Sequence, residues 1–135
     1  MDHSKAPEVF NESHWSDPNF SNIGKYPKSK TLAELAAWKF YESLPKNDRF
    51  ELSVVNPCSV YGPSLVKDPK SATAQSFLIW MNNLFPAGKT PKLTFAFVDV
   101  RDLVTAQIRC LERDAAQGKR IIIARDVPMW ATDIN

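Results

Sequence analysis

Residues 26–38 read Tyr-Pro-Lys-Ser-Lys-Thr-Leu-Ala-Glu-Leu-Ala-Ala-Trp, and this stretch predicts the first long helix of the fold. Ala, Leu, Glu and Lys all favour the helical state. Pro27 suits the first helical position, where its missing N–H costs nothing, and Pro45 ends the helix. Because a residue before proline is pushed away from helical angles, we expect Tyr26 at the cap rather than inside the helix.

Tyr26 and Lys30 lie four residues apart, which puts a phenol and an ammonium on one face of that helix. A nearby positive charge favours the phenolate form of a tyrosine. Such a pair can exchange a proton with an alcohol or a carbonyl oxygen. The spacing alone leaves a second interpretation open, in which both side chains are solvated on an exposed turn.

Strands and helices alternate along the rest of the chain. The predicted elements are a strand over 50–56, a helix over 71–85, a strand over 92–98, a helix from Val100 capped by Asp99, a strand over 120–124 and the start of a helix within 128–135. The helix from Val100 has the clearest pattern, because its apolar residues recur at intervals of three and four. The alternation predicts an α/β fold with at least part of a parallel sheet.

The composition argues against several classes of partner. The 17 Lys and Arg nearly balance the 15 Asp and Glu, which does not favour nucleic acid as the principal partner. The longest apolar runs are too short to span a bilayer, so no membrane partner is expected. Cys58 and Cys110 lie far apart without metal-ligand spacing, which predicts no metal site, reduced thiols and a cytoplasmic protein.

Two stretches carry a resemblance to a known family. They are residues 26–38 and 54–63 (VVNPCSVYGP), and Phe97-Val98-Asp99-Val100-Arg101-Asp102 and Gly118-Lys119-Arg120 follow in the same order. From about Val9 to the C-terminus the chain resembles the extended short-chain dehydrogenases/reductases of the NAD-dependent epimerase/dehydratase superfamily. Within them it is most similar to the group of dihydroflavonol, cinnamoyl-CoA and methylglyoxal reductases.

The resemblance implies an NADP-dependent reductase, with NAD as the alternative cofactor, acting on a small-molecule aldehyde or ketone. Tyr26 matches the family's catalytic tyrosine, which protonates the carbonyl oxygen. Lys30 matches the lysine that makes this tyrosine more acidic and hydrogen-bonds the nicotinamide ribose. The loop and helix over 64–84 correspond to the wall of the substrate pocket.

The resemblance also implies further cofactor contacts. The segment that lies along the nicotinamide corresponds to Pro57, Cys58 and Val60, and Ser71 matches a polar residue that approaches the cofactor. Free cysteines are usually small buried apolar side chains, so the residue type favours this packing role for Cys58 instead of a cofactor contact.

The chain departs from the family where the pyrophosphate would bind. Its four glycines, Gly24, Gly62, Gly88 and Gly118, are too dispersed for the expected glycine-rich turn, and no serine fits the family's upstream catalytic position. We therefore expect the C-terminal portion of a Rossmann-like doubly wound sheet plus part of a small substrate domain, with the N-terminal dinucleotide-binding half missing.

The expected organisation is a single partial domain with three segments. Residues 1–25 are loop, 26–63 hold the catalytic helix and the strand after it, and 64–135 hold the substrate-side and C-terminal segments. Two alternatives to a reductase stay open. One is a truncated non-catalytic fragment or pseudoenzyme, and the other is an interaction module that self-associates or binds a partner through an exposed sheet edge.

Overall fold

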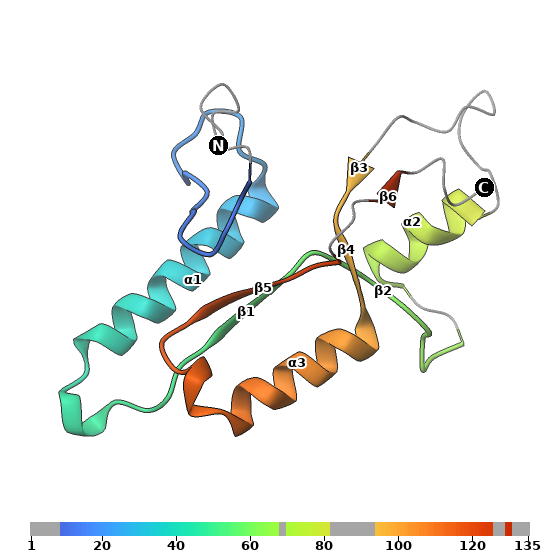
Figure 1. Cartoon of the computed structure of the whole chain (residues 1–135). Helices are drawn as coiled ribbons and strands as arrows, with labels where there is room; N and C mark the ends of the chain where they lie inside the picture. The colour runs from blue at the N-terminus through green and yellow to red at the C-terminus, as the bar shows by residue number, and fades with distance from the viewer. Residues whose placement is uncertain (1–8, 68–69, 82–93, 126–128, 131–135) are drawn as a thin grey trace. The chain divides into compact units, whose positions relative to one another are not determined.

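The computed structural model describes residues 9–67, 70–81, 94–125 and 129–130. Its internal contacts divide the chain into two compact units. Unit 1 comprises Met1–Val54 and Ala115–Ile121, and unit 2 comprises Val55–Asp114 and Ile122–Asn135. Each unit therefore joins two stretches that are far apart in sequence (Figure 1).

Unit 1 is built on the helix α1 (Lys25–Ser43), which follows the loop over residues 9–24. Its first intrahelical bond runs from the Lys28 N–H to the Gly24 carbonyl at 3.1 Å, and Gly24 is the N-cap. Tyr26 therefore lies inside the first turn, and the expectation of a cap position is wrong. Pro27 is tolerated there because the first N–H groups of a helix have no intrahelical acceptor.

Aromatic side chains pack the far end of α1 onto the chain that follows it. The Tyr41 ring lies edge-on to the rings of Trp38 and Phe50, with centroids 6.2 and 5.8 Å away. Between Tyr41 and Phe50 the chain forms a 3-10 turn, η2 (Lys46–Asp48). The Arg49 guanidinium donates to the carbonyls of Glu42 and Leu44, which satisfies two groups that the helix end leaves without partners.

The strands β1 (Val54–Pro57) and β5 (Arg120–Ile123) are neighbours in one two-stranded sheet. The strand predicted over 50–56 is thus confirmed only from Val54 onward, and the strand predicted over 120–124 is confirmed to Ile123. Ahead of β1, the Leu52 carbonyl accepts from the Gly118 N–H at 2.7 Å.

Unit 2 contains a parallel pair of strands, β2 (Ser59–Tyr61) and β4 (Phe97–Asp99). The helices α2 (Ala72–Met81) and α3 (Val100–Glu112) both contact this pair. Val98 on β4 and Leu103 on α3 are buried, because both side chains face this packing. The α/β class with a partly parallel sheet is confirmed.

Two predicted elements differ from the structure. The strand predicted over 92–98 is interrupted at Ala96, whose carbonyl accepts from the Ser59 N–H at 3.3 Å, so that β3 (Thr94–Phe95) precedes β4. β3 pairs antiparallel with β6 (Met129–Trp130). The helix predicted within 128–135 is therefore wrong at these two residues, and its other residues, like 82–85 of the predicted second helix, lie outside the described part.

The predicted cap of α3 is confirmed, because the Asp99 carboxylate accepts from the Arg101 N–H at 2.8 Å. The Arg101 side chain also binds it, at 2.8 and 2.6 Å. These hydrogen bonds lower the pKa of the Asp99 carboxyl from 3.8 to about 2. A short 3-10 turn, η4 (Asp114–Ala116), follows α3.

The Asp99 cap predicts a pH dependence of stability. Because its pKa is lower in the folded chain, the ionised carboxyl stabilises the fold fully above about pH 4, and this contribution is lost as the pH falls through about 2. We expect Asp99→Asn to unfold more easily than the parent chain at pH 5, and the difference to vanish toward pH 2. Urea unfolding at each pH measures it, with Asp102→Asn as the matched control. A difference that stays constant across this range would contradict the prediction.

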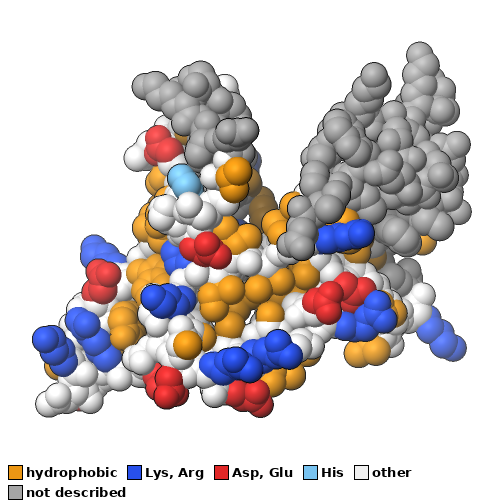
Figure 2. Space-filling view, viewed as in Figure 1, with side chains coloured by type: hydrophobic (Ala, Val, Ile, Leu, Met, Phe, Trp, Pro, Cys, Tyr) orange, Lys and Arg blue, Asp and Glu red, His pale blue; other side chains and the backbone are white. Residues whose placement is uncertain are grey.

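Apolar side chains reach the surface among the charged ones (Figure 2). On α3 the Val104, Ile108 and Leu111 side chains are exposed, Leu111 by 85%. None of the described helices is both long enough and apolar enough to cross a membrane.

Candidate functional site

The predicted Tyr–Lys pair lies on the first turns of α1. The Lys30 Nζ atom is 5.6 Å from the centroid of the Tyr26 ring, so the two side chains share one face of the helix as predicted. The Tyr26 side chain is 72% exposed. An ammonium at this distance interacts favourably with the face of an aromatic ring. The two side chains are therefore adjacent, and the Tyr26 ring is exposed.

One turn after Lys30, Glu34 forms an ion pair with Arg120 of β5. The Nε–Oε1 distance is 2.6 Å and the Nη2–Oε2 distance is 3.2 Å, which makes a two-pronged contact. The Arg120 and Glu34 side chains are only 18% and 12% exposed. The Trp38 indole N–H donates to the same Oε1 at 3.3 Å. Sequence reasoning missed this cluster, because its partners are 86 residues apart.

Arg120 also ties the loop over residues 9–24 to the rest of unit 1. Its Nη1 donates to the carbonyls of Glu12 and His14, the latter at 3.0 Å. Its guanidinium stacks on the Trp15 ring, 3.7 Å from the centroid. A cavity of about 610 Å³ adjoins this cluster. Arg120 thus links the loop, α1 and β5 through a single side chain.

The segment predicted to lie along a nicotinamide runs from the end of β1 into β2. Pro57 is exposed, whereas Cys58 and Val60 are half-buried. The Cys58 N–H donates to the Ile123 carbonyl at 3.1 Å, and burial raises the pKa of its thiol. A raised pKa keeps the thiol protonated, which suits the packing role that its residue type favours.

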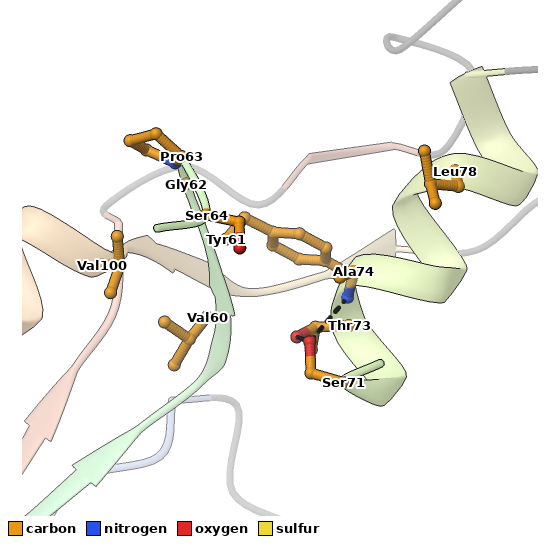
Figure 3. A pocket seen from close by; sticks show the side chains of 10 residues that line it. All are labelled: Val60, Tyr61, Gly62, Pro63, Ser64, Ser71, Thr73, Ala74, Leu78 and Val100. Atoms are coloured by element: carbon orange, nitrogen blue, oxygen red, sulfur yellow. Dashed lines mark hydrogen bonds between the residues drawn. The ribbon is translucent and has the colours of Figure 1, made fainter. Parts of the chain in front are cut away.

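A cavity of about 530 Å³ opens in unit 2 between the end of β2 and the start of α2 (Figure 3). It is lined by Val60, Tyr61, Gly62, Pro63, Ser64, Ser71, Thr73, Ala74, Leu78 and Val100. The Tyr61 ring extends toward α2, and burial raises the pKa of its phenol. The lining is mostly apolar with a few hydroxyl groups, which is the usual character of a small-molecule site.

Ser71 lies in this lining and directly precedes α2. Its Oγ accepts from the Ala74 N–H at 3.2 Å, in the usual geometry of a helix N-cap, and lies 3.5 Å from the Thr73 hydroxyl. A cap keeps the hydroxyl at a fixed position at the cavity wall. The predicted cofactor contact of Ser71 is not tested by this geometry and stays a prediction.

Gly62 lets the chain turn sharply at the end of β2. Its φ is +143°, and a Cβ placed there would lie 2.6 Å from the Val100 Cγ1 atom. Only glycine avoids both the strained backbone and the steric overlap. A Gly-Pro pair is typical of a turn, but nothing in the local sequence indicates that α3 approaches so closely.

The predicted site residues are thus distributed over the two units. Tyr26 and Lys30 belong to unit 1, and Pro57, Cys58, Val60 and Ser71 belong to unit 2. Their joint use in one site stays a prediction. Within the described ranges, no group of three or more His, Cys, Asp or Glu side chains could hold a metal ion.

Comparison with known proteins shows which proteins the chain resembles in sequence and in structure. No family model matches the chain. It is 38% identical over 120 residues to a putative NADPH-dependent methylglyoxal reductase of Candida albicans, covering 87% of the chain and 35% of that protein. It is also 38% identical over 127 residues to tetraketide alpha-pyrone reductase 2 of Arabidopsis thaliana, covering 93% of the chain and 37% of that protein. The chain is homologous to part of these reductases.

The fold supports this relationship. The solved structure of yeast methylglyoxal/isovaleraldehyde reductase complexed with NADPH superimposes with a TM-score of 0.80 at 31% identity, over 92% of the chain and 38% of that structure. The predicted resemblance to the extended short-chain dehydrogenases/reductases is confirmed. The chain spans just over a third of the length of the curated relatives that it matches.

Proposed function

We propose that the chain is the proton-donating and substrate-binding part of an NADPH-dependent reductase of aldehydes or ketones. The observation that carries the proposal is the Tyr26–Lys30 pair, with the ammonium 5.6 Å from the ring centroid on an open face of α1. Two of the reductases that the chain resembles are NADPH-dependent by name, and the yeast methylglyoxal/isovaleraldehyde reductase was solved in complex with NADPH, which makes this the favoured use of the pair.

Tyr26 donates its phenolic proton to the carbonyl oxygen of the substrate. Reduction of a carbonyl carbon leaves negative charge on that oxygen, so an oriented proton donor within reach lowers the barrier. Lys30 favours this transfer, because its positive charge stabilises the phenolate that Tyr26 becomes. NADPH, when bound, supplies the hydride.

The residues present fit one end of that cofactor. The half-buried, apolar segment around Cys58 and Val60 suits one face of a planar nicotinamide ring, and Lys30 can hydrogen-bond a ribose hydroxyl. Pro57 and Ser71 complete the proposed contacts. The four glycines are too dispersed for a glycine-rich turn that binds a pyrophosphate, so the proposed contacts are limited to the nicotinamide end of the cofactor. NADP is favoured over NAD because of the named cofactor of the relatives.

The cavity in unit 2 is the proposed substrate site. The described residues that line it carry no formal charge, and its polar groups include the hydroxyls of Ser64, Ser71 and Thr73. Such a lining favours an uncharged carbonyl compound with an apolar substituent, because a buried charge without a counter-charge is costly. The residues that line the site come from the predicted pocket segment over 64–84, from residues 60–63 and from Val100 of α3.

A chimera tests the proposal. Residues 9–125 replace the matching segment of the NADPH-dependent methylglyoxal reductase of Saccharomyces cerevisiae, and NADPH consumption is followed with methylglyoxal as substrate. We expect substrate-dependent turnover, because the chain would supply the donor pair and the pocket. A folded chimera that binds NADPH without turnover would contradict the proposal and favour the non-catalytic alternative.

A further inference from the structure

Glu34 lies one helical turn beyond Lys30 on α1, at the spacing at which side chains on a helix meet. A carboxylate and an ammonium at this spacing ordinarily attract each other. A contact between Lys30 and Glu34 would draw the Lys30 ammonium away from the Tyr26 ring. It would also place a negative charge beside the Tyr26–Lys30 pair. In this structure the Lys30 ammonium instead lies over the Tyr26 ring.

Arg120 engages the Glu34 carboxylate. Its Nε and Nη2 atoms bind the two carboxylate oxygens at 2.6 and 3.2 Å, and the Trp38 indole adds a third donor. Both members of the pair are mostly buried, so the ion pair is stronger and less screened than a surface contact would be. No ion pair of Lys30 is found among the residues that the structure describes.

We propose that Arg120 is a positioning residue that holds the Glu34 carboxylate away from Lys30, which leaves the Lys30 ammonium to act on Tyr26. The functional meaning of this inference rests on the proposed function, in which Tyr26 is the proton donor. The electrostatic effect on the phenol does not depend on turnover and can be measured in the isolated chain.

Lys25 and Lys28 flank Tyr26 in the sequence of α1, and the groups that this inference invokes lie on three segments of unit 1. Lys30 and Glu34 are on α1, and Arg120 is on β5. His14, in the loop over residues 9–24, accepts from Arg120 through its carbonyl, and its ring contacts Asn11 and Phe10.

The test follows the ionisation of Tyr26 by NMR in the 135-residue chain labelled with ¹³C at the tyrosine Cζ atoms. The chain has three tyrosines, and Tyr26→Phe assigns the signal of residue 26. We expect Arg120→Gln to move the Tyr26 titration up by about 0.3 pH units at low ionic strength, the shift that one extra negative charge about 10 Å away produces in water. The double variant Glu34→Gln/Arg120→Gln should return to the parent titration.

Three outcomes would overturn the inference. They are an unmoved Tyr26 titration in a folded Arg120→Gln chain, a double variant that behaves like the single one, and a shift that survives about 1 M salt, where screening acts over about 3 Å. If Arg120→Gln does not fold, Glu34→Gln is measured alone, and a Tyr26 titration that moves up would overturn the inference. The Tyr41 and Tyr61 signals are internal controls. Since no turnover is measured, failure here is distinct from failure of the proposed function.

Discussion

Tyr26→Phe is expected to lower carbonyl reduction by the chimera about 10²- to 10⁴-fold, the usual contribution of a positioned general acid or base. The substitution removes the hydroxyl and keeps the ring, so the contact with the Lys30 ammonium is preserved. The 72% exposure of the side chain means that little packing is lost. The effect should therefore fall on turnover, measured as NADPH consumption under saturating substrate.

Tyr41→Phe is the matched control, because Tyr41 is on the same helix and packs against Trp38 and Phe50. It should leave turnover unchanged. NADPH affinity, measured by calorimetry, should be similar in the parent chimera and both variants. Turnover that persists in Tyr26→Phe would remove Tyr26 from the role of proton donor.

Gly62→Ala is expected to destabilise unit 2 by about 2–6 kcal/mol. A residue with a side chain at φ +143° stores backbone strain of about 1–3 kcal/mol. Its Cβ would also lie 2.6 Å from the Val100 Cγ1 atom, and overpacking of this kind costs about 1–3 kcal/mol. The β-branched Val100 cannot rotate freely out of the way in a helix. Urea denaturation of the 135-residue chain measures the change.

Gly118→Ala separates the two causes of this loss. Gly118 also has a positive φ, +69°, but a Cβ added there would have no atom within 4 Å. It should therefore lose only about 1–2 kcal/mol through backbone strain. Adding Val100→Ala to Gly62→Ala should recover part of the stability by removing the overlap. Equal losses at positions 62 and 118 would show that the contact with α3 is unimportant.

The parts of the fold that local sequence could predict are those decided by neighbours along the chain. The start of α3 followed from the capping carboxylate of Asp99 and from apolar residues at helical spacing. The bounds of the strands were predicted less well from local sequence, because a strand ends where its hydrogen bonds to the neighbouring strand end. The predicted strand over 92–98 is split at Ala96, where the chain hydrogen-bonds to Ser59 of another segment.

In the candidate site, too, local sequence predicted only the contacts between residues that are close along the chain. Tyr26 and Lys30 are separated by one turn of one helix, so their spacing alone predicted their contact. The Arg120–Glu34 pair and the approach of Val100 to Gly62 are contacts between distant segments, and no local pattern encodes them. The position of Tyr26 inside the first turn was missed because the general restriction on residues before proline was given more weight than the tolerance of the first turn.

The Arg120 contacts set an order of events during synthesis on the ribosome. The loop that accepts hydrogen bonds from Arg120 leaves the ribosome more than 100 residues before Arg120 does, since its carbonyls lie 106 and 108 positions earlier. The nascent α1 therefore carries Glu34 without its arginine while the whole of residues 55–114 is made. Unit 1 is complete only after Ala115–Ile121 have emerged. Slowed translation or chaperone binding before that point would therefore act on an incomplete unit.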